Sequence, residues 1–347
     1  MRILKIAVVG AGLIGKKHIE LILKNPDCIL SGIVDPDRAA YGELARSLGV
    51  PLHHEIDDLL AENVDGIVIS SPNQFHAEQA IKCIERCIPV LIEKPITDSL
   101  DDGIKLVQLV KNKSAKVLIG HHRAHSPILA TARRIIVDNM LGRIVTIMGS
   151  ALFYKPADYF EAGPWRTKIG GGPILINLIH EIGNFRSLCG EISAVQAIAS
   201  SAIRQFPVED TVVINFQFAN GALGTFVLSD TAASARSWEH TSQENKSYPV
   251  SLDEDCYIVT GTMGSLSIPT MRIKYYKDSQ AQSWLKPFEN ETISVDRMDP
   301  LECQLNHFLS VIRGTAKPLV SAEDGLQNLR ITTAIAESAK NRKMVYL

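Results

Sequence analysis

Short apolar runs alternate with amphipathic stretches through the first third of the chain. The apolar runs are four to seven residues long and rich in small and β-branched side chains, as buried parallel strands are. The stretches between them carry apolar residues at helical spacing. Strands that alternate with helices predict βαβ units and a doubly wound parallel sheet. The five runs cover residues 6–9, 30–35, 64–70, 90–93 and 116–120.

After about residue 140 the pattern changes to consecutive strand-like runs joined by short turns, of which Asn220-Gly221 is a strong hairpin turn. This order predicts an α+β domain with an open, mainly antiparallel sheet. We divide the chain into domains of residues 1–122 and 123–347. A helix is predicted over 173–189, strands over 192–203, 209–219, 221–232, 255–261, 264–269 and 272–277, a surface loop over 232–251, and closing helices over 301–314 and 322–341.

One face of the second sheet is expected to lack a helical cover. We assign to this open face the apolar residues Val212, Ile214, Phe216, Phe226 and Leu228, which alternate with a second set. An exposed apolar sheet face is usually buried against another copy of the chain. The pattern therefore predicts a homodimer or homotetramer.

The first apolar run leads directly into a glycine motif, Gly10-x-Gly12-x-x-Gly15, and a helical stretch follows. The first glycine makes a tight turn, the second lets the backbone approach a pyrophosphate, and the third lets the helix pack on the strand. The helix N-terminus offers N–H groups to phosphate. Asp35 lies 20 residues after Gly15, where a carboxylate binds the ribose 2′-hydroxyl of NAD. The pattern predicts a Rossmann domain that binds NAD rather than NADP.

Composition and charge exclude several classes of protein. A net charge of −2 without a basic block argues against nucleic acid or a membrane surface as partner. No apolar run reaches the ~20 residues of a membrane span, and no signal-peptide cleavage site follows the N-terminus, so we expect a cytoplasmic protein. The six cysteines form no CxxC pair, and the histidine clusters lack neighbouring carboxylates or thiolates. We therefore expect free thiols and no metal site.

Three further loops follow predicted parallel strands. They are Ser71-Pro72-Asn73, Glu93-Lys94-Pro95 and His121-His122-Arg123. Right-handed crossovers place the loops after the strands along one edge of the sheet. We expect these loops to converge with the glycine motif.

On these motifs the chain resembles the glucose–fructose oxidoreductase / inositol dehydrogenase / MocA family over nearly its whole length. The most specific match is Glu93-Lys94-Pro95 after a strand. The other matches are Ser71-Pro72-Asn73 with His76, the segment 120–127, Trp165-Arg166, and the glycine run 170–172 before a helix that carries His180. The resemblance implies a Rossmann domain, an open antiparallel α/β domain and a homo-oligomer. It also implies NAD(P)-dependent oxidation or reduction at a sugar, cyclitol or related hydroxyl or carbonyl.

The resemblance also implies the residues that handle the proton. Lys94 and His180 match the catalytic lysine and histidine of the family. Members commonly carry an aspartate four residues before that histidine, where this chain has Ile176, followed by Asn177. A neutral amide stabilises an imidazolium less than a carboxylate does, so we expect Lys94 to carry more of the proton transfer.

The candidate residues form two groups. Those for the cofactor are Gly10, Gly12, Leu13, Ile14, Gly15, Asp35, Arg38, Ser71, Pro72, Asn73, His76, Glu93, Lys94 and Arg123. Those for a small-molecule substrate are Lys94, His122, Tyr154, Trp165, Arg166, Asn177, His180 and Trp238. Aromatic rings stack on the C–H faces of sugars, and arginine binds hydroxyls or carboxylates.

We favour a dehydrogenase, and three other functions stay open. They are an NAD-dependent glycosidase without net redox change, a non-catalytic regulator that senses NAD and sugar, and a dehydrogenase of a non-sugar ring such as a cis-dihydrodiol. The presence of Lys94 and His180 favours an enzyme over a sensor.

Overall fold

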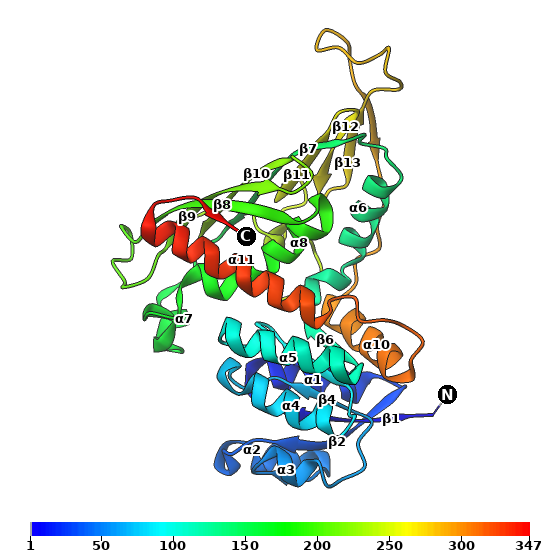
Figure 1. The fold of residues 1–347 in the computed structure, drawn as a ribbon, viewed down its shortest axis with the longest axis vertical. Coiled ribbons are helices and arrows are strands. Elements are labelled where there is room, and N and C mark those ends of the chain that lie inside the picture. Colours follow the sequence, from blue (N-terminus) through cyan, green and yellow to red (C-terminus); the bar gives the residue numbers. More distant parts are fainter. Residues whose placement is uncertain (1) are drawn as a thin grey trace. The chain divides into compact units, whose positions relative to one another are not determined.

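A computed structural model describes residues 2–347, which form two compact units (Figure 1). The first unit contains residues 2–125 together with Pro300–Leu329, and the second contains Ser126–Asp299 together with Arg330–Leu347. The segment 300–329, expected in the second domain, packs with the first unit because Leu305, Phe308 and Leu309 are buried in one of its cores.

The first unit is built on a parallel six-stranded sheet of order β3-β2-β1-β4-β5-β6, which confirms the predicted doubly wound Rossmann fold. The strands are β1 (Leu4–Val9), β2 (Cys28–Val34), β3 (Leu52–His53), β4 (Gly66–Ile69), β5 (Val90–Glu93) and β6 (Val117–Gly120). Helices α1 (Leu13–Lys24), α2 (Arg38–Leu48) and α10 (Pro300–Arg313) contribute to the core on one face. Helices α3 (Ile56–Leu59), α4 (His76–Glu85) and α5 (Leu100–Lys113) contribute to the core on the other.

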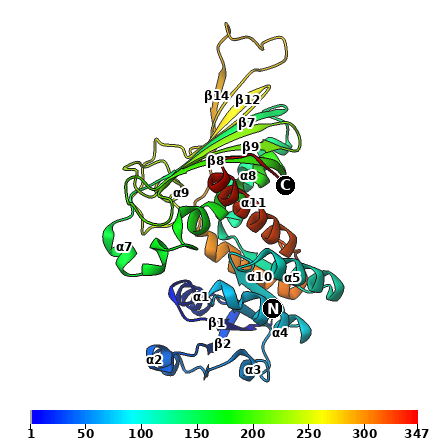
Figure 2. The same ribbon diagram turned by 60° about the vertical axis from the view of Figure 1, so that its left-hand side comes forward.

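The second unit contains a nine-stranded, mostly antiparallel sheet of order β14-β13-β12-β11-β7-β10-β9-β8-β15 (Figure 2). Its strands are β7 (Ile144–Leu152), β8 (Ile192–Ser200), β9 (Thr211–Phe218), β10 (Leu223–Ser229), β11 (Tyr257–Gly261), β12 (Gly264–Ile268), β13 (Arg272–Tyr275), β14 (Glu289–Thr292) and β15 (Val345–Tyr346). Its helices are α6 (Pro127–Val137), α7 (Ala157–Glu161), α8 (Ile179–Cys189) and α9 (Trp238–Thr241), with a π-helical turn at Ile174–Leu178. Helix α11 (Ala322–Asn341) contributes residues to both units.

Strand β7 lies inside this sheet although the sequence pattern did not predict it. It pairs in parallel with β10 and antiparallel with β11. A Cβ on Gly149 would lie 2.7 Å from the ring of Phe185 and 2.8 Å from that of Phe226, so large neighbours fill the space of a side chain there. Gly149 thus stands at a core-facing position of β7, where an alternating strand pattern would have an apolar side chain. The hairpin at Asn220-Gly221 is confirmed, since β9 and β10 pair antiparallel around it.

The assignment of the open sheet face was wrong. The five residues placed on it, Val212, Ile214, Phe216, Phe226 and Leu228, are all buried in the core of the second unit. The alternating set is the exposed one: Ile198 is 71% and Val213 43% exposed, and the two are register partners across β8 and β9. An alternating pattern separates the two faces of a strand, but it does not say which face the helices cover.

The expected surface loop 232–251 is also partly internal. Trp238 is only 4% exposed, and its Nε1 donates a hydrogen bond of 2.9 Å to Glu244. Within residues 2–347, no helix combines the length and the apolar character needed to cross a lipid bilayer.

The glycine motif allows a matched test of local packing. A Cβ on Gly15 would lie 1.9 Å from the carbonyl oxygen of Gly10, whereas a Cβ on Gly12 would meet no atom within 4 Å. Gly15→Ala should therefore destabilise the first unit by about 2 kcal/mol or more, which corresponds to a fall of roughly 4 °C or more in its Tm. Gly12→Ala should leave the Tm close to that of the parent. Thermal melts of the cofactor-free protein measure both, and equal Tm values for the two variants would contradict the packing.

Candidate functional site

The glycine turn after β1 is packed directly against the loop after β4. Gly10 has φ +86°, and a Cβ there would lie 2.6 Å from the backbone nitrogen of Ser71. The Ser70 hydroxyl donates to the carbonyls of Val9 and Gly10, at 3.0 and 2.8 Å. These contacts join the two loops, and only glycine provides both the backbone conformation and the space.

The N-terminus of α1 is open to a ligand. Gly12, the residue before the helix, has empty space where a side chain would be, and no side chain caps the helix. The first turn contains no acidic residue, and Leu13 is 88% exposed. Uncapped N–H groups, the positive helix end and an open backbone are what a pyrophosphate requires, so these residues fit the cofactor that the motif predicts. Ile14 lies half-buried in the same turn.

Asp35 lies directly after β2 and is held against the glycine turn. Its carboxylate accepts hydrogen bonds from the backbone N–H of Ala11, at 2.8 Å, and of Asp37, at 3.0 Å. The side chain is thereby oriented beside the turn where a ribose diol would bind. Arg38 is exposed at the start of α2.

A buried carboxylate lies at the end of β5. Glu93 is 5% exposed, and its Oε1 lies 2.8 Å from Nε2 of His18 on α1. The backbone N–H of Lys94 donates to its other oxygen at 3.2 Å. Burial by itself would raise the pKa of Glu93, but the His18 hydrogen bond and the basic groups around the carboxylate hold it below its ordinary value.

Lys94 lies in a setting that lowers the pKa of its ammonium group below the ordinary value. Burial lowers the pKa of its ammonium group and Arg123 lowers it further, while Glu93 partly offsets both effects. Burial, reinforced by Arg123, also lowers the pKa of His122, to about 3. His122 is therefore neutral near pH 7 and is suited to hydrogen bonding rather than to carrying a proton.

His76 connects two of the loops. It is 1% exposed, with Nδ1 2.8 Å from the carbonyl of Pro95 and Nε2 2.9 Å from the carbonyl of Ser71. A neutral imidazole has one N–H and can donate to one of these two carbonyls at a time, and either way His76 packs between the loops after β4 and β5. Pro72 and Asn73, in contrast, are exposed beside it.

The substrate candidates His180 and Asn177 lie in the second unit, whereas Lys94 lies in the first. His180 is buried in α8, and Asn177 lies in the π-helical turn before that helix. The Asn177 amide oxygen accepts a hydrogen bond of 2.7 Å from Nζ of Lys155. Ile176 occupies the position where the resemblance implies an aspartate. The residue that follows it, Asn177, is the one that is hydrogen-bonded to the lysine.

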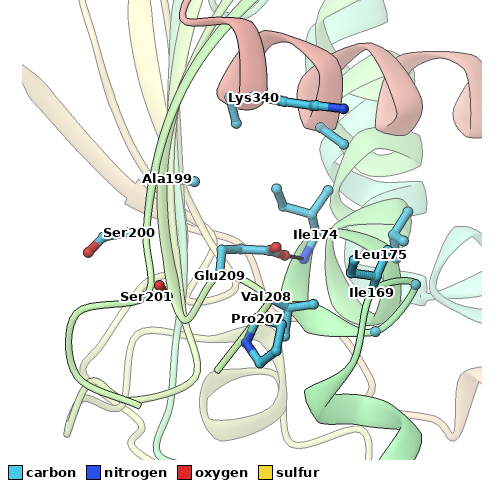
Figure 3. Close-up of a pocket in the computed structure, with 14 residues that line it drawn as sticks. Ile169, Ile174, Leu175, Ala199, Ser200, Ser201, Pro207, Val208, Glu209 and Lys340 are labelled. Carbon is cyan, nitrogen blue, oxygen red and sulfur yellow. Dashed lines mark hydrogen bonds between the residues drawn. The ribbon is translucent and has the colours of Figure 1, made fainter. Parts of the chain in front are cut away.

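A cavity of about 400 Å³ borders the start of this turn (Figure 3). Glu209 reaches across it and accepts a hydrogen bond of 2.9 Å from the backbone N–H of Ile174. A Cβ on Gly172 would lie 2.6 Å from the Glu209 carboxylate, which explains the glycine at that position. Burial raises the pKa of Glu209. Glu209 thus positions the turn that leads to Asn177 and His180.

The remaining substrate candidates differ in their surroundings. Tyr154 is 62% and Trp165 55% exposed, and Arg166 lies over the ring of Tyr159 at 4.0 Å. Trp238 packs in the core, 5.6 Å from the ring of Tyr257, and has no surface to offer a ligand.

Sequence reasoning missed His18, Lys155 and Glu209. Each acts through a partner distant in sequence, and no local motif marks it.

Neither the histidine pairs nor the cysteines form a metal centre in the described part of the chain, where no group of three or more His, Cys, Asp or Glu side chains could hold an ion. The six cysteines are free thiols, and four of them are buried.

Comparisons with known proteins agree with this geometry. Residues 4–121 match the model of an oxidoreductase family with an NAD-binding Rossmann fold, and residues 133–347 match the C-terminal alpha/beta domain of the same family. The chain is 26% identical to scyllo-inositol 2-dehydrogenase (NAD(+)) of Bacillus subtilis, over 98% of this chain and 95% of that protein. It is 22% identical to inositol 2-dehydrogenase of Rhizobium meliloti, over 98% of each.

Among solved structures, the WlbA dehydrogenase of Bordetella pertussis in complex with NADH and UDP-GlcNAcA superposes with a TM-score of 0.79. The two chains are 21% identical, and the match covers 100% of this chain and 99% of that one. The family models together span most of both units. The chain therefore belongs to the glucose–fructose oxidoreductase / inositol dehydrogenase / MocA family of NAD-binding oxidoreductases.

Proposed function

We propose that this protein is an NAD-dependent dehydrogenase of a sugar, cyclitol or related polyol in which Lys94 and His180 handle the proton. The observation that carries the proposal is the setting of Lys94. It follows β5 in the loop that His76 ties to the loop after β4, and its pKa is lowered by burial. A lysine that loses its proton readily beside a cofactor loop is suited to acid–base chemistry.

When bound, NAD supplies the acceptor for a hydride from the substrate carbon. The protein must then orient the substrate hydroxyl and remove one proton. In the oxidising direction neutral Lys94 accepts the hydroxyl proton through Nζ, and in the reducing direction the ammonium returns it. The ammonium also stabilises negative charge on the reacting oxygen through a hydrogen bond.

His180 supplies a second basic nitrogen. Asn177 lies three residues before it, and its amide oxygen is bonded to Lys155 rather than to an imidazole. Asn177 bears no negative charge, so an imidazolium at His180 gains less stabilisation than an aspartate would provide. This is the reason to assign the larger share of proton transfer to Lys94.

A panel of substrates tests the reaction class. Purified protein is mixed with NAD and with cyclitols, aldoses, glycosides and cis-dihydrodiols, and NADH absorbance and aglycone release are followed together. Net NADH from a polyol supports the proposal. Aglycone release without net NADH would show that the protein is a glycosidase instead. NADH formed only from dihydrodiols would show that the substrate is a non-sugar ring and not a polyol.

Substitution of Lys94 should impair the chemical step more than substitution of His180. We expect Lys94→Ala and His180→Ala each to slow single-turnover hydride transfer by roughly 10²–10⁴-fold. NAD affinity should stay largely intact, because neither side chain is needed to contact the pyrophosphate or the ribose. In the parent, kcat/KM for oxidation should rise with pH through a value below the ordinary lysine pKa, because neutral Lys94 is the base. Lys94→Ala should lose that limb, and the exposed Lys24→Ala serves as the matched control. Near-parental rates in Lys94→Ala would overturn the assignment.

Asp35 should determine the preference for NAD over NADP. Its carboxylate accepts from a ribose 2′-hydroxyl and repels a 2′-phosphate. Asp35→Ser should weaken NAD binding by roughly 10-fold or more and narrow the gap to NADP. Asp35→Asn keeps an acceptor for the Ala11 N–H and separates the effect of charge from the support of the turn. Calorimetric titration of both cofactors measures the ratio, and equal or tighter NADP binding by the parent would refute the role.

We also propose that the exposed sheet face of the second unit joins copies of this chain into a homodimer or homotetramer. Exposed Ile198, Val213 and Met148 form part of this face. Ile198→Glu would bury a carboxylate in such an interface and should shift the protein toward monomers in sedimentation velocity at micromolar concentration. A monomeric parent, or an unchanged assembly in the variant, would count against this interface.

A further inference from the structure

Lys155 is a second lysine with a lowered pKa, and it lies in the second unit, just after β7. Its Nζ donates a hydrogen bond of 2.7 Å to the amide oxygen of Asn177. The same nitrogen lies 5.3 Å from the ring centroid of Phe153 and 4.7 Å from that of Tyr159. Because an ammonium group only donates, it fixes the amide oxygen of Asn177 toward itself. The amide NH₂ group is consequently directed away from Lys155, where it can donate to another partner.

A second cation shares one of these rings. Arg166 lies 4.0 Å from the centroid of Tyr159, and its guanidinium donates to the Tyr159 carbonyl. Within residues 2–347, neither Lys155 nor Arg166 forms an ion pair with a carboxylate. The nearby Asp230 is paired with Arg204 at 2.7 Å, and both of those side chains are largely buried. The carboxylate of Asp230 is therefore already paired, and Lys155 has no carboxylate within ion-pair distance in the described part of the chain.

Burial makes this arrangement costly for the ammonium. It lowers the pKa of Lys155 to about 8, although Asp230 and Glu239 oppose the effect; Arg166 and Arg204 lower the pKa further. The amide oxygen of Asn177 is a neutral acceptor, and neither the two aromatic rings nor Asp230 and Glu239 offset the effect of burial on the pKa of this ammonium. A ligand that brought negative charge to Nζ would remove this penalty.

We propose that Lys155 and Asn177, with the charge of Arg166 nearby, bind a carboxylate group of the substrate. The inference rests on the proposed dehydrogenase function and narrows its substrate to a carboxylated sugar or polyol. The two remaining ammonium hydrogens and the two amide hydrogens match the roughly four lone-pair sites of a carboxylate. All of these donors belong to side chains, whereas phosphate sites typically add backbone N–H groups at a helix N-terminus. Lys155 and Asn177 are thus specificity-determining residues.

The test uses matched neutral and acidic substrates with the NAD-loaded protein. D-glucose is compared with D-glucuronate, D-galactose with D-galacturonate, and a hexose phosphate is the third class. NADH formation gives kcat/KM, and calorimetry gives affinity independently of turnover. We expect the parent to prefer the acid of a pair by at least about 10-fold, and Lys155→Met to reduce that preference by roughly 10–100-fold. Lys155→Arg keeps the charge and should retain most of the preference, as should the exposed control Lys277→Met.

The parent protein alone provides a second measurement. Affinity for the acid, but not for its neutral partner, should fall as the pH rises through about 8, because Lys155 then loses its charge in the presence of Asp230, Glu239, Arg166 and Arg204. Equal binding of acid and neutral sugar, or an equal loss of both in Lys155→Met, would overturn the proposal. A preference for the hexose phosphate over the sugar acids would show that the site binds a phosphate group and would overturn the assignment of a carboxylate. If no compound of the panel yields NADH, the dehydrogenase function fails, while calorimetric binding still decides the carboxylate site.

Discussion

The buried carboxylate of Glu93 connects the elements of the first unit that surround the predicted cofactor site. It links the end of β5 to α1 through His18, and it accepts the backbone N–H of the following Lys94. A Cβ on Gly120 would lie 2.9 Å from the same carboxyl group, so the end of β6 is shaped around it. A charge buried this deeply is stable only with such partners. Helix α1, which follows the glycine motif, and the loop of Lys94 after β5 are therefore both bonded to the carboxylate of Glu93.

The second unit uses the same principle at a different place. Glu209 accepts the N–H of Ile174 and lies against Gly172, which fixes where the π-helical turn begins. Lys155 then bonds Asn177 within that turn. Two contacts distant in sequence thus position the start of the helix that carries His180. Ile176 stands where the resemblance implies an aspartate, and the polar side chain of the next residue, Asn177, is bonded to Lys155.

Local patterns were sufficient for much of the fold and for the cofactor loop. The strand, the three glycines and Asp35 are close in sequence, and each has a separate steric or electrostatic reason, so their combination predicts one structure. The sequence pattern does not predict strand β7, because Gly149 interrupts its alternation of apolar residues at the point where the rings of Phe185 and Phe226 fill the space of a side chain. Trp238 was placed on the surface because its segment is polar, although its indole is buried and bonded to Glu244.

Sequence alone predicts the parallel sheet, the glycine turn and the hairpin at Asn220-Gly221, and it names Lys94 and His180 as candidates. Each of these depends on residues near one another in the chain or on a motif. Only the tertiary structure decided which face of the second sheet is exposed, because periodicity is the same for both faces. It also decided the partners of Glu93, Glu209 and Lys155. Burial and pairing arise from residues brought together across the fold, and these contacts set the pKa of each ionisable group.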